Sequence, residues 1–245
     1  KLQIVYQDGA LYLDAAGNHK HCFCAGTSTH CDHEVLTFVE WDDPTSLPTS
    51  GNYFLETDVD LTAATTISGE LNLCLNGHTI KNVAANTRVL NVASGTVTLT
   101  DCAKASGTVT GGNRDYGAGI TVSNGTTLNL YNVKISGNEN KTDGGALYIR
   151  GGGTVNMFSG EISCNTARTG AAVCIADKAT NPGVFNLYGG TYTMAANTNK
   201  NAYVMNIADN GGIINITSGN DGINTNEDNV SVTTMNGGTL NIVCD

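Results

Sequence analysis

Leu128-Asn129-Leu130 places one polar residue between two apolar ones, and six other short segments of the chain do the same. This alternation is the period of a half-buried β-strand. The seven segments are Leu71-Asn72-Leu73, Val97-Thr98-Leu99, Leu128-Asn129-Leu130, Val155-Asn156-Met157, Phe185-Asn186-Leu187, Ile214-Asn215-Ile216 and Leu240-Asn241-Ile242.

The spacing of these segments indicates a stacked repeat. Their first residues are separated by 26, 31, 27, 30, 29 and 26 positions. A strand that returns at a nearly fixed interval is typical of a solenoid rather than an ordinary globular sheet. We therefore predict an all-β fold, a single-stranded parallel β-helix of about seven coils over residues 51–245. Its apolar positions point inward and its Asn and Thr point outward.

Each repeat also contains two further strand segments, which predict a flattened triangular coil. One lies upstream of the Leu-Asn-Leu segment, as in Gly119 to Val122, and one lies downstream, as in Val133 to Ile135. The downstream strands tend to close on asparagine, which tolerates left-handed backbone and can hydrogen-bond along a stack. We expect an internal asparagine ladder there. Its predicted members are Asn82, Asn113, Asn138, Asn165, Asn197 and Asn226.

Composition and charge narrow the classes of partner. The chain has 245 residues, 30 Gly, 3 Pro and a net charge of −10, with only 12 Lys plus Arg. Nucleic-acid binding depends on neutralising phosphates, so the charge argues against it. No segment approaches the length of a membrane span. Eight cysteines, an even number, suggest an exported protein in which disulfides persist.

Residues 1–50 lack the repeat and are predicted to form a cap over the first coil. Two apolar segments separated by Asp8-Gly9 predict a hairpin. A cluster of Cys and His follows, and a structural zinc site would satisfy it. Its predicted ligands are Cys22, Cys24, Cys31 and His33. The alternative is one disulfide with solvated histidines. Trp41, the only tryptophan, is expected to pack in this cap.

Cys74 and Cys102 are 28 residues apart, about one coil. Neighbouring strands in a sheet lie about 4.8 Å apart, which is within the Cα separation that a disulfide spans. These two cysteines are therefore expected to lie on adjacent rungs and are a candidate disulfide pair.

Several segments resemble known β-helix families. Leu73-Cys74-Leu75-Asn76-Gly77-His78-Thr79-Ile80 resembles repeats in large surface proteins of anaerobic gut-type bacteria, and Gly144-Gly145-Ala146-Leu147 with Ile162-Ser163-Cys164-Asn165 is similar to autotransporter adhesins, with Ile162 where that pattern has Phe. Residues 211–223 resemble calcium-containing, polysaccharide-binding β-helices related to pectate lyases. These resemblances imply a right-handed coil, a bacterial cell-surface or extracellular location, and carbohydrate or host-surface binding.

Two sets of charged residues are candidates for further sites. Asp221 and Asp228, with neighbouring amides, offer the clustered oxygens that calcium prefers; the alternative is an ordinary polar loop. Arg114, Lys141 and Arg168 fall on consecutive turns. With Arg150, Asp143 and Asp177 they could form the cleft of a polysaccharide lyase or glycoside hydrolase. The alternative is solvated charge with weak surface ion pairs.

We expect a non-catalytic extracellular module that binds polysaccharide or host glycan through the outward Asn row. The predicted ligand-binding residues are Asn129, Asn156, Asn186, Asn215, Tyr131 and Tyr188, with Tyr116, Tyr148 and Tyr203 as further stacking positions. The alternatives are the enzyme just described and a stalk that spaces other domains of the same polypeptide.

Overall fold

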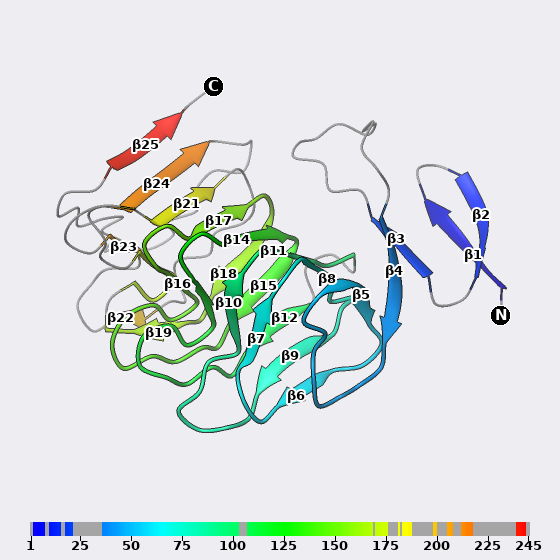
Figure 1. Cartoon of the computed structure of the whole chain (residues 1–245), viewed down its shortest axis with the longest axis horizontal. Coiled ribbons are helices and arrows are strands. Elements are labelled where there is room, and N and C mark those ends of the chain that lie inside the picture. The colour runs from blue at the N-terminus through cyan, green and yellow to red at the C-terminus, as the bar shows by residue number, and fades with distance from the viewer. Residues whose placement is uncertain are drawn as a thin grey trace.

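The computed structural model describes residues 36–102, 107–168, 170–175, 181 and 183–186. It also describes the backbone of residues 2–7, 10–15, 18–21, 187, 198–199, 205–207, 212–217 and 239–243. Throughout these residues the chain forms strands and turns, with no helix (Figure 1). The fold is a parallel β-solenoid, as the repeat predicts.

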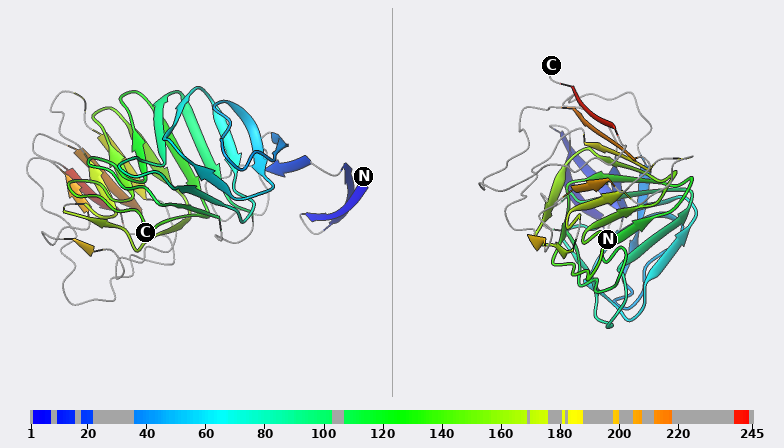
Figure 2. Two further views of the ribbon diagram at one scale, coloured as in Figure 1. Left: turned by 90° about the horizontal axis from the view of Figure 1, so that it is seen from below. Right: turned by 90° about the vertical axis from the view of Figure 1, so that its left-hand side faces the viewer.

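Three stacked sheets form the walls of the solenoid (Figure 2). The motif wall holds the Leu-Asn-Leu segments in the order β25-β24-β21-β17-β14-β11-β8-β5-β4-β3. Its strands are β3 (Asn18–His21), β4 (Leu36–Trp41), β5 (Gly51–Leu55), β8 (Leu71–Cys74), β11 (Thr96–Thr100), β14 (Thr127–Tyr131), β17 (Thr154–Met157), β21 (Gly183–Leu187), β24 (Gly212–Thr217) and β25 (Thr239–Val243).

The other two walls match the predicted upstream and downstream strands. The upstream wall consists of β7 (Thr65–Ser68), β10 (Leu90–Ser94), β13 (Ile120–Val122), β16 (Leu147–Ile149), β20 (Val173–Ile175) and β23 (Met205–Ile207). The downstream wall consists of β6 (Val59–Leu61), β9 (Thr79–Asn82), β12 (Thr108–Thr110), β15 (Val133–Ser136) and β18 (Gly160–Ser163). A short pair, β19 (Thr166–Ala167) and β22 (Thr198–Asn199), completes the stack.

The number of turns is smaller than predicted, about four rather than seven. All seven Leu-Asn-Leu segments do pair in the motif wall, from β8 to β25. The downstream wall, however, has five strands and ends at β18, so its strands span four intervals. The sequence count assumed that every motif strand belongs to a complete three-walled turn, and the predicted downstream strands after β18 lie outside the described residues.

The core is a column of stacked aliphatic side chains. Leu71, Val97, Leu128 and Val155 pair in register on consecutive motif strands, and each is fully buried. Burial of such a side chain contributes about 1.5–3 kcal/mol, and the repeat supplies several per turn. Glycine is required where the upstream corner packs tightly. A Cβ on Gly119 would clash with the carbonyl oxygen of Ala146 on the next turn.

The predicted internal amide ladder is present between two turns. Asn138 Nδ2 donates to Asn165 Oδ1 at 3.0 Å, and both side chains are buried. Asn82 is also buried, but it bonds within its own turn, to Arg88 O and Ala84 N. The prediction was wrong for Asn113, which is exposed. Gly112 takes the ladder position instead, and its N–H donates to Asn138 Oδ1 at 3.0 Å.

The N-terminal residues form the predicted hairpin, in which β1 (Leu2–Gln7) pairs antiparallel with β2 (Ala10–Ala15). β3 pairs antiparallel with β4, and β4 pairs in parallel with β5. Parallel pairing in the motif wall therefore begins at Leu36–Trp41. Trp41 packs against the first turn, where its Nε1 donates to Ser46 O at 2.9 Å and its ring meets Tyr53 edge-on at 5.2 Å.

Candidate functional site

The outward polar residues of the motif wall form one continuous file. Strand pairing places Asn129 opposite Asn156, and Asn156 opposite Asn186. The same register continues to both sides. The whole file is Asn52, Asn72, Thr98, Asn129, Asn156, Asn186, Asn215 and Asn241. The prediction that Asn129 and Asn156 lie on adjacent layers of one wall is confirmed.

Side-chain amides in this polar file bond to one another. Asn186 Nδ2 donates to Asn156 Oδ1 at 2.8 Å, and Asn156 Nδ2 donates to Asn129 Oδ1 at 2.9 Å. Each side chain is half-buried. A carboxamide has two N–H donors and two acceptor lone pairs. Asn156 therefore uses one donor and one acceptor within the file and keeps the others for solvent or a ligand.

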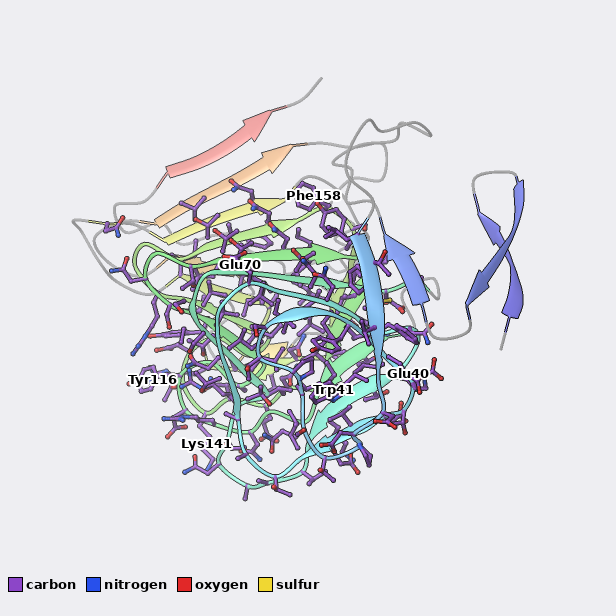
Figure 3. The ribbon with its side chains drawn as sticks, turned by 45° about the vertical axis from the view of Figure 1, so that its right-hand side comes forward. Glu40, Trp41, Glu70, Tyr116, Lys141 and Phe158 are labelled. Atoms are coloured by element: carbon purple, nitrogen blue, oxygen red, sulfur yellow. The ribbon has the colours of Figure 1, made fainter. Side chains whose placement is uncertain are left out.

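Aromatic and hydroxyl groups flank the polar file. Tyr131 and Phe158 stack with ring centroids 4.5 Å apart and planes 11° from parallel. Both rings are half-buried, and burial raises the pKa of Tyr131. On the opposite side of the file, Thr127 and Thr154 pair in register and are half-buried. The result is a regular strip of hydroxyl, amide and aromatic groups on one outer surface. Phe158 is labelled near the top of the solenoid in Figure 3.

The strip is interrupted at β11. Thr98 and Thr100 are 4% and 5% exposed although they belong to the outer face of β11. Phe54 and Cys74, which pair in the next position along the wall, form a buried cluster with Phe38 that is separate from the main core. Beyond β11 the file is half-buried again at Asn72 and Asn52, where Asn72 Nδ2 donates to Asn52 Oδ1 at 2.8 Å. The longest described run of half-exposed amides is therefore on β14, β17 and β21.

The structure brings together four of the six predicted ligand-binding residues, Asn129, Asn156, Asn186 and Tyr131. The backbone of Asn215 continues the file in β24, but its side chain and all of Tyr188 lie outside the described residues. The prediction that Tyr148 contributes to the same face was wrong. Tyr148 lies in β16 on the upstream wall and contacts Tyr116 edge-on, with centroids 6.2 Å apart.

Phe158 is a residue of the strip that the sequence reading missed. It follows Val155-Asn156-Met157, as Tyr131 follows Leu128-Asn129-Leu130 and Tyr188 follows Phe185-Asn186-Leu187. An aromatic residue therefore recurs directly after three successive motif segments. That recurrence is readable from the sequence once the repeat is aligned.

The metal predictions fall on other parts of the chain. Cys22, Cys24, Cys31 and His33, proposed for zinc, and Asp221 and Asp228, proposed for calcium, all lie outside the described residues. Among the residues that the structure does describe, no three His, Cys, Asp or Glu side chains converge as a metal site. In that same part of the chain no helix is long and apolar enough to cross a membrane.

Cys74 and Cys102 are neighbours, as the repeat length predicts, but their sulfur atoms are too far apart for a disulfide bond. The Cys74 Sγ–H points at Cys102 Sγ, 3.6 Å away. This hydrogen bond is the main cause of a raised pKa of Cys74 and a lowered pKa of Cys102. The expected disulfide between Cys74 and Cys102 is therefore not formed.

Of the charged residues considered for catalysis, Arg168 and Asp143 form a surface ion pair. Arg168 Nη2 lies 3.5 Å from Asp143 Oδ1. A further carboxylate, Glu161, pairs with Lys134, whose Nζ lies 3.1 Å from Glu161 Oε1. Burial alone would raise the pKa of Glu161, but hydrogen bonds from Ser163 and Lys134 outweigh it and lower the pKa. A glycosidase general acid needs a shift in the opposite direction. Asp177 lies outside the described residues.

Comparisons with protein-family models, curated proteins and solved structures give no match. The strand pairing alone therefore defines the class of this protein, a parallel β-solenoid. The finer resemblances to gut-type surface proteins and to pectate-lyase-like β-helices have no support from these comparisons.

Proposed function

We propose that the protein is a non-catalytic module that binds an extended carbohydrate chain on the outer face of β14, β17 and β21. The observation on which this rests is the half-exposed amide file Asn129, Asn156 and Asn186, beside the stacked rings of Tyr131 and Phe158. Sugar hydroxyls both donate and accept hydrogen bonds, as carboxamides do. The apolar faces of sugar rings pack on aromatic side chains.

Regular spacing favours a polymer over a compact ligand. Adjacent strands in a sheet lie about 4.8 Å apart, so the file offers equivalent amides at even steps along the solenoid axis. Because the amides already hold one another in place, little side-chain entropy is lost when a ligand binds. The proposal locates the module outside a bacterial cell, a location supported only by the repeat-motif resemblance.

The test is a glycan array, followed by affinity electrophoresis of the wild type and four variants. We expect Asn156→Ala and Tyr131→Ala to weaken binding by about two- to tenfold each, since one hydrogen bond or one ring contact contributes about 0.5–1.5 kcal/mol. Tyr131→Phe keeps the ring and should retain most of the affinity. The matched control is Ser136→Ala, a half-buried position on the downstream wall.

Other outcomes identify the alternatives. Equal affinity of Asn156→Ala, Tyr131→Ala and Ser136→Ala would reject this face as the binding site. A folded protein that retains no glycan would favour a stalk, to which the same amide file contributes rigidity. Release of an unsaturated product from pectin, followed by its absorbance, would establish a lyase and overturn the non-catalytic proposal.

A further inference from the structure

A second cluster of polar and charged groups lies on the upstream wall. Register places Asn91 opposite Thr121, and Thr121 opposite Tyr148, as an outward file. The Arg88 side chain lies over this file, where its Nη1 is 3.4 Å from Asn91 Oδ1 and its Nη2 is 3.4 Å from Tyr116 O. Arg88 thus joins two turns of the solenoid.

Three arginines gather here without an acidic partner. The bridge between Thr87 and Asn113 puts Arg88 and Arg114 on adjacent turns, and Arg150 directly follows β16. Within the described residues no carboxylate lies within 4.0 Å of any of the three guanidinium groups, whereas Arg168 pairs with Asp143. Partial burial, followed by the nearby charges of Arg114 and Arg150, lowers the pKa of Arg88 to about 10.

Two buried polar atoms at this place have no hydrogen-bond partner, Arg88 Nε and Thr121 Oγ1. Thr121 is 1% exposed and lies directly beneath Gly117, where no Cβ would fit. Buried polar groups are satisfied in the great majority of folded proteins, so two unsatisfied atoms in one cluster need an explanation. An oxyanion bound at the outer nitrogens of the three guanidinium groups would compensate their positive charges.

Two tyrosines border the arginines. Tyr116 is 51% exposed and touches Tyr148 edge-on. Burial raises the pKa of Tyr148 to about 12, so its hydroxyl remains a neutral donor. Figure 3 shows Tyr116 projecting on the same side of the molecule as Lys141, away from Phe158. We refer to Arg88, Arg114, Arg150, Tyr116 and Tyr148 as the arginine patch.

We propose that the arginine patch binds an oxyanion attached to a saccharide, either the carboxylate of a uronic acid or a sulfate ester. Guanidinium groups match planar and tetrahedral oxyanions through paired N–H donors, and an exposed tyrosine ring offers a surface for a sugar ring. The net charge of −10 disfavours long, densely charged polymers such as nucleic acid. This ligand is a saccharide, as in the proposed function, but the arginine patch lies on the upstream wall rather than on the motif wall.

The experiment measures retention of the intact chain in gels that contain polygalacturonate, dextran sulfate or uncharged dextran. We expect retention by one or both anionic polymers, not by dextran, and a loss of at least about tenfold in affinity for Arg114→Gln combined with Arg150→Gln. Replacing both arginines by Lys keeps the charge but removes the paired donors, so its affinity should be intermediate. Preference for polygalacturonate identifies a carboxylate ligand, and preference for dextran sulfate identifies a sulfate.

Lys81→Gln, which removes an exposed cation from the downstream wall, is the matched control. Equal loss in Lys81→Gln and in the double arginine variant would show non-specific charge attraction and overturn the proposal, as would the absence of retention by both anionic polymers. Asn156→Ala tests the other wall. If it leaves anionic retention intact while the double arginine variant abolishes it, the arginine patch stands independently of the amide face.

Discussion

Replacing Asn165 by alanine is the sharpest test of the ladder that holds the turns together. The side chain is fully buried. Its Nδ2 donates to Ile135 O at 3.0 Å and to Ser163 O at 2.9 Å, and its Oδ1 accepts from Asn138 N at 3.1 Å and from Asn138 Nδ2 at 3.0 Å. Alanine removes all four bonds at once, at a position that is fully buried from solvent.

The expected cost follows from that count. An intramolecular hydrogen bond contributes about 1 kcal/mol net, and a buried group left without a partner costs about 1–3 kcal/mol. Asn138 Nδ2 keeps contacts to Val109 O and Ser136 O at 3.3 Å, which limits its loss. We therefore expect Asn165→Ala to lower the free energy of unfolding by about 3–5 kcal/mol.

The measurement is urea unfolding followed by far-ultraviolet circular dichroism, with amide hydrogen exchange at Asn138 as a local probe. Asn156→Ala is the matched control, because its two amide bonds lie on the half-exposed face, where water replaces them; its cost should stay within about 1 kcal/mol. A loss of less than about 1 kcal/mol for Asn165→Ala, equal to that of the control, would refute the reasoning that the inner amides hold neighbouring turns together.

Two further predictions concern titratable groups. With oxidised glutathione as the electron acceptor, Cys74 and Cys102 should lose two protons and two electrons and form a disulfide, because their sulfurs need only close from 3.6 Å to about 2.05 Å; thiol titration should fall by two, and Cys102→Ser should abolish that loss. Glu161 has a lowered folded-state pKa, so its contribution is present above its unfolded pKa and is lost as pH falls through the folded value. The acid dependence of unfolding should therefore flatten in Glu161→Gln, and an unchanged slope would contradict this assignment.

The fold could be predicted from the sequence because a solenoid converts sequence distance into spatial distance. Residues one repeat apart, such as Asn129 and Asn156, lie opposite each other on paired strands of the same wall. The same rule placed Cys102 beside Cys74 and Asn138 beside Asn165. Each of these contacts depends only on the repeat length and on the strand alternation, and both can be read from a single chain.

The sequence predictions failed where the repeat length varies and where the outcome depends on side-chain positions. The third turn reaches the ladder position at Gly112, one residue before the predicted Asn113, so a backbone N–H replaces a side-chain amide. Tyr148 was grouped with the amide face by residue type alone, although the repeat places it in an upstream strand. That no described carboxylate pairs with Arg88, Arg114 or Arg150 depends on side-chain positions, which spacing does not determine.

Burial divides the asparagines of this protein into two functional groups. After the downstream strands, the buried Asn138 and Asn165 side chains hydrogen-bond to each other and to neighbouring backbone. These bonds hold one turn on the next. On the motif wall, Asn156 bonds only to the amides above and below it and keeps one donor and one acceptor. The same residue type therefore stabilises the stack on the inside and leaves hydrogen-bonding groups available on the outside. Because the inner ladder and the aliphatic core already hold the turns, outward residues are free to differ between walls. That freedom allows neutral amides and aromatic rings to gather on one wall and arginines on another.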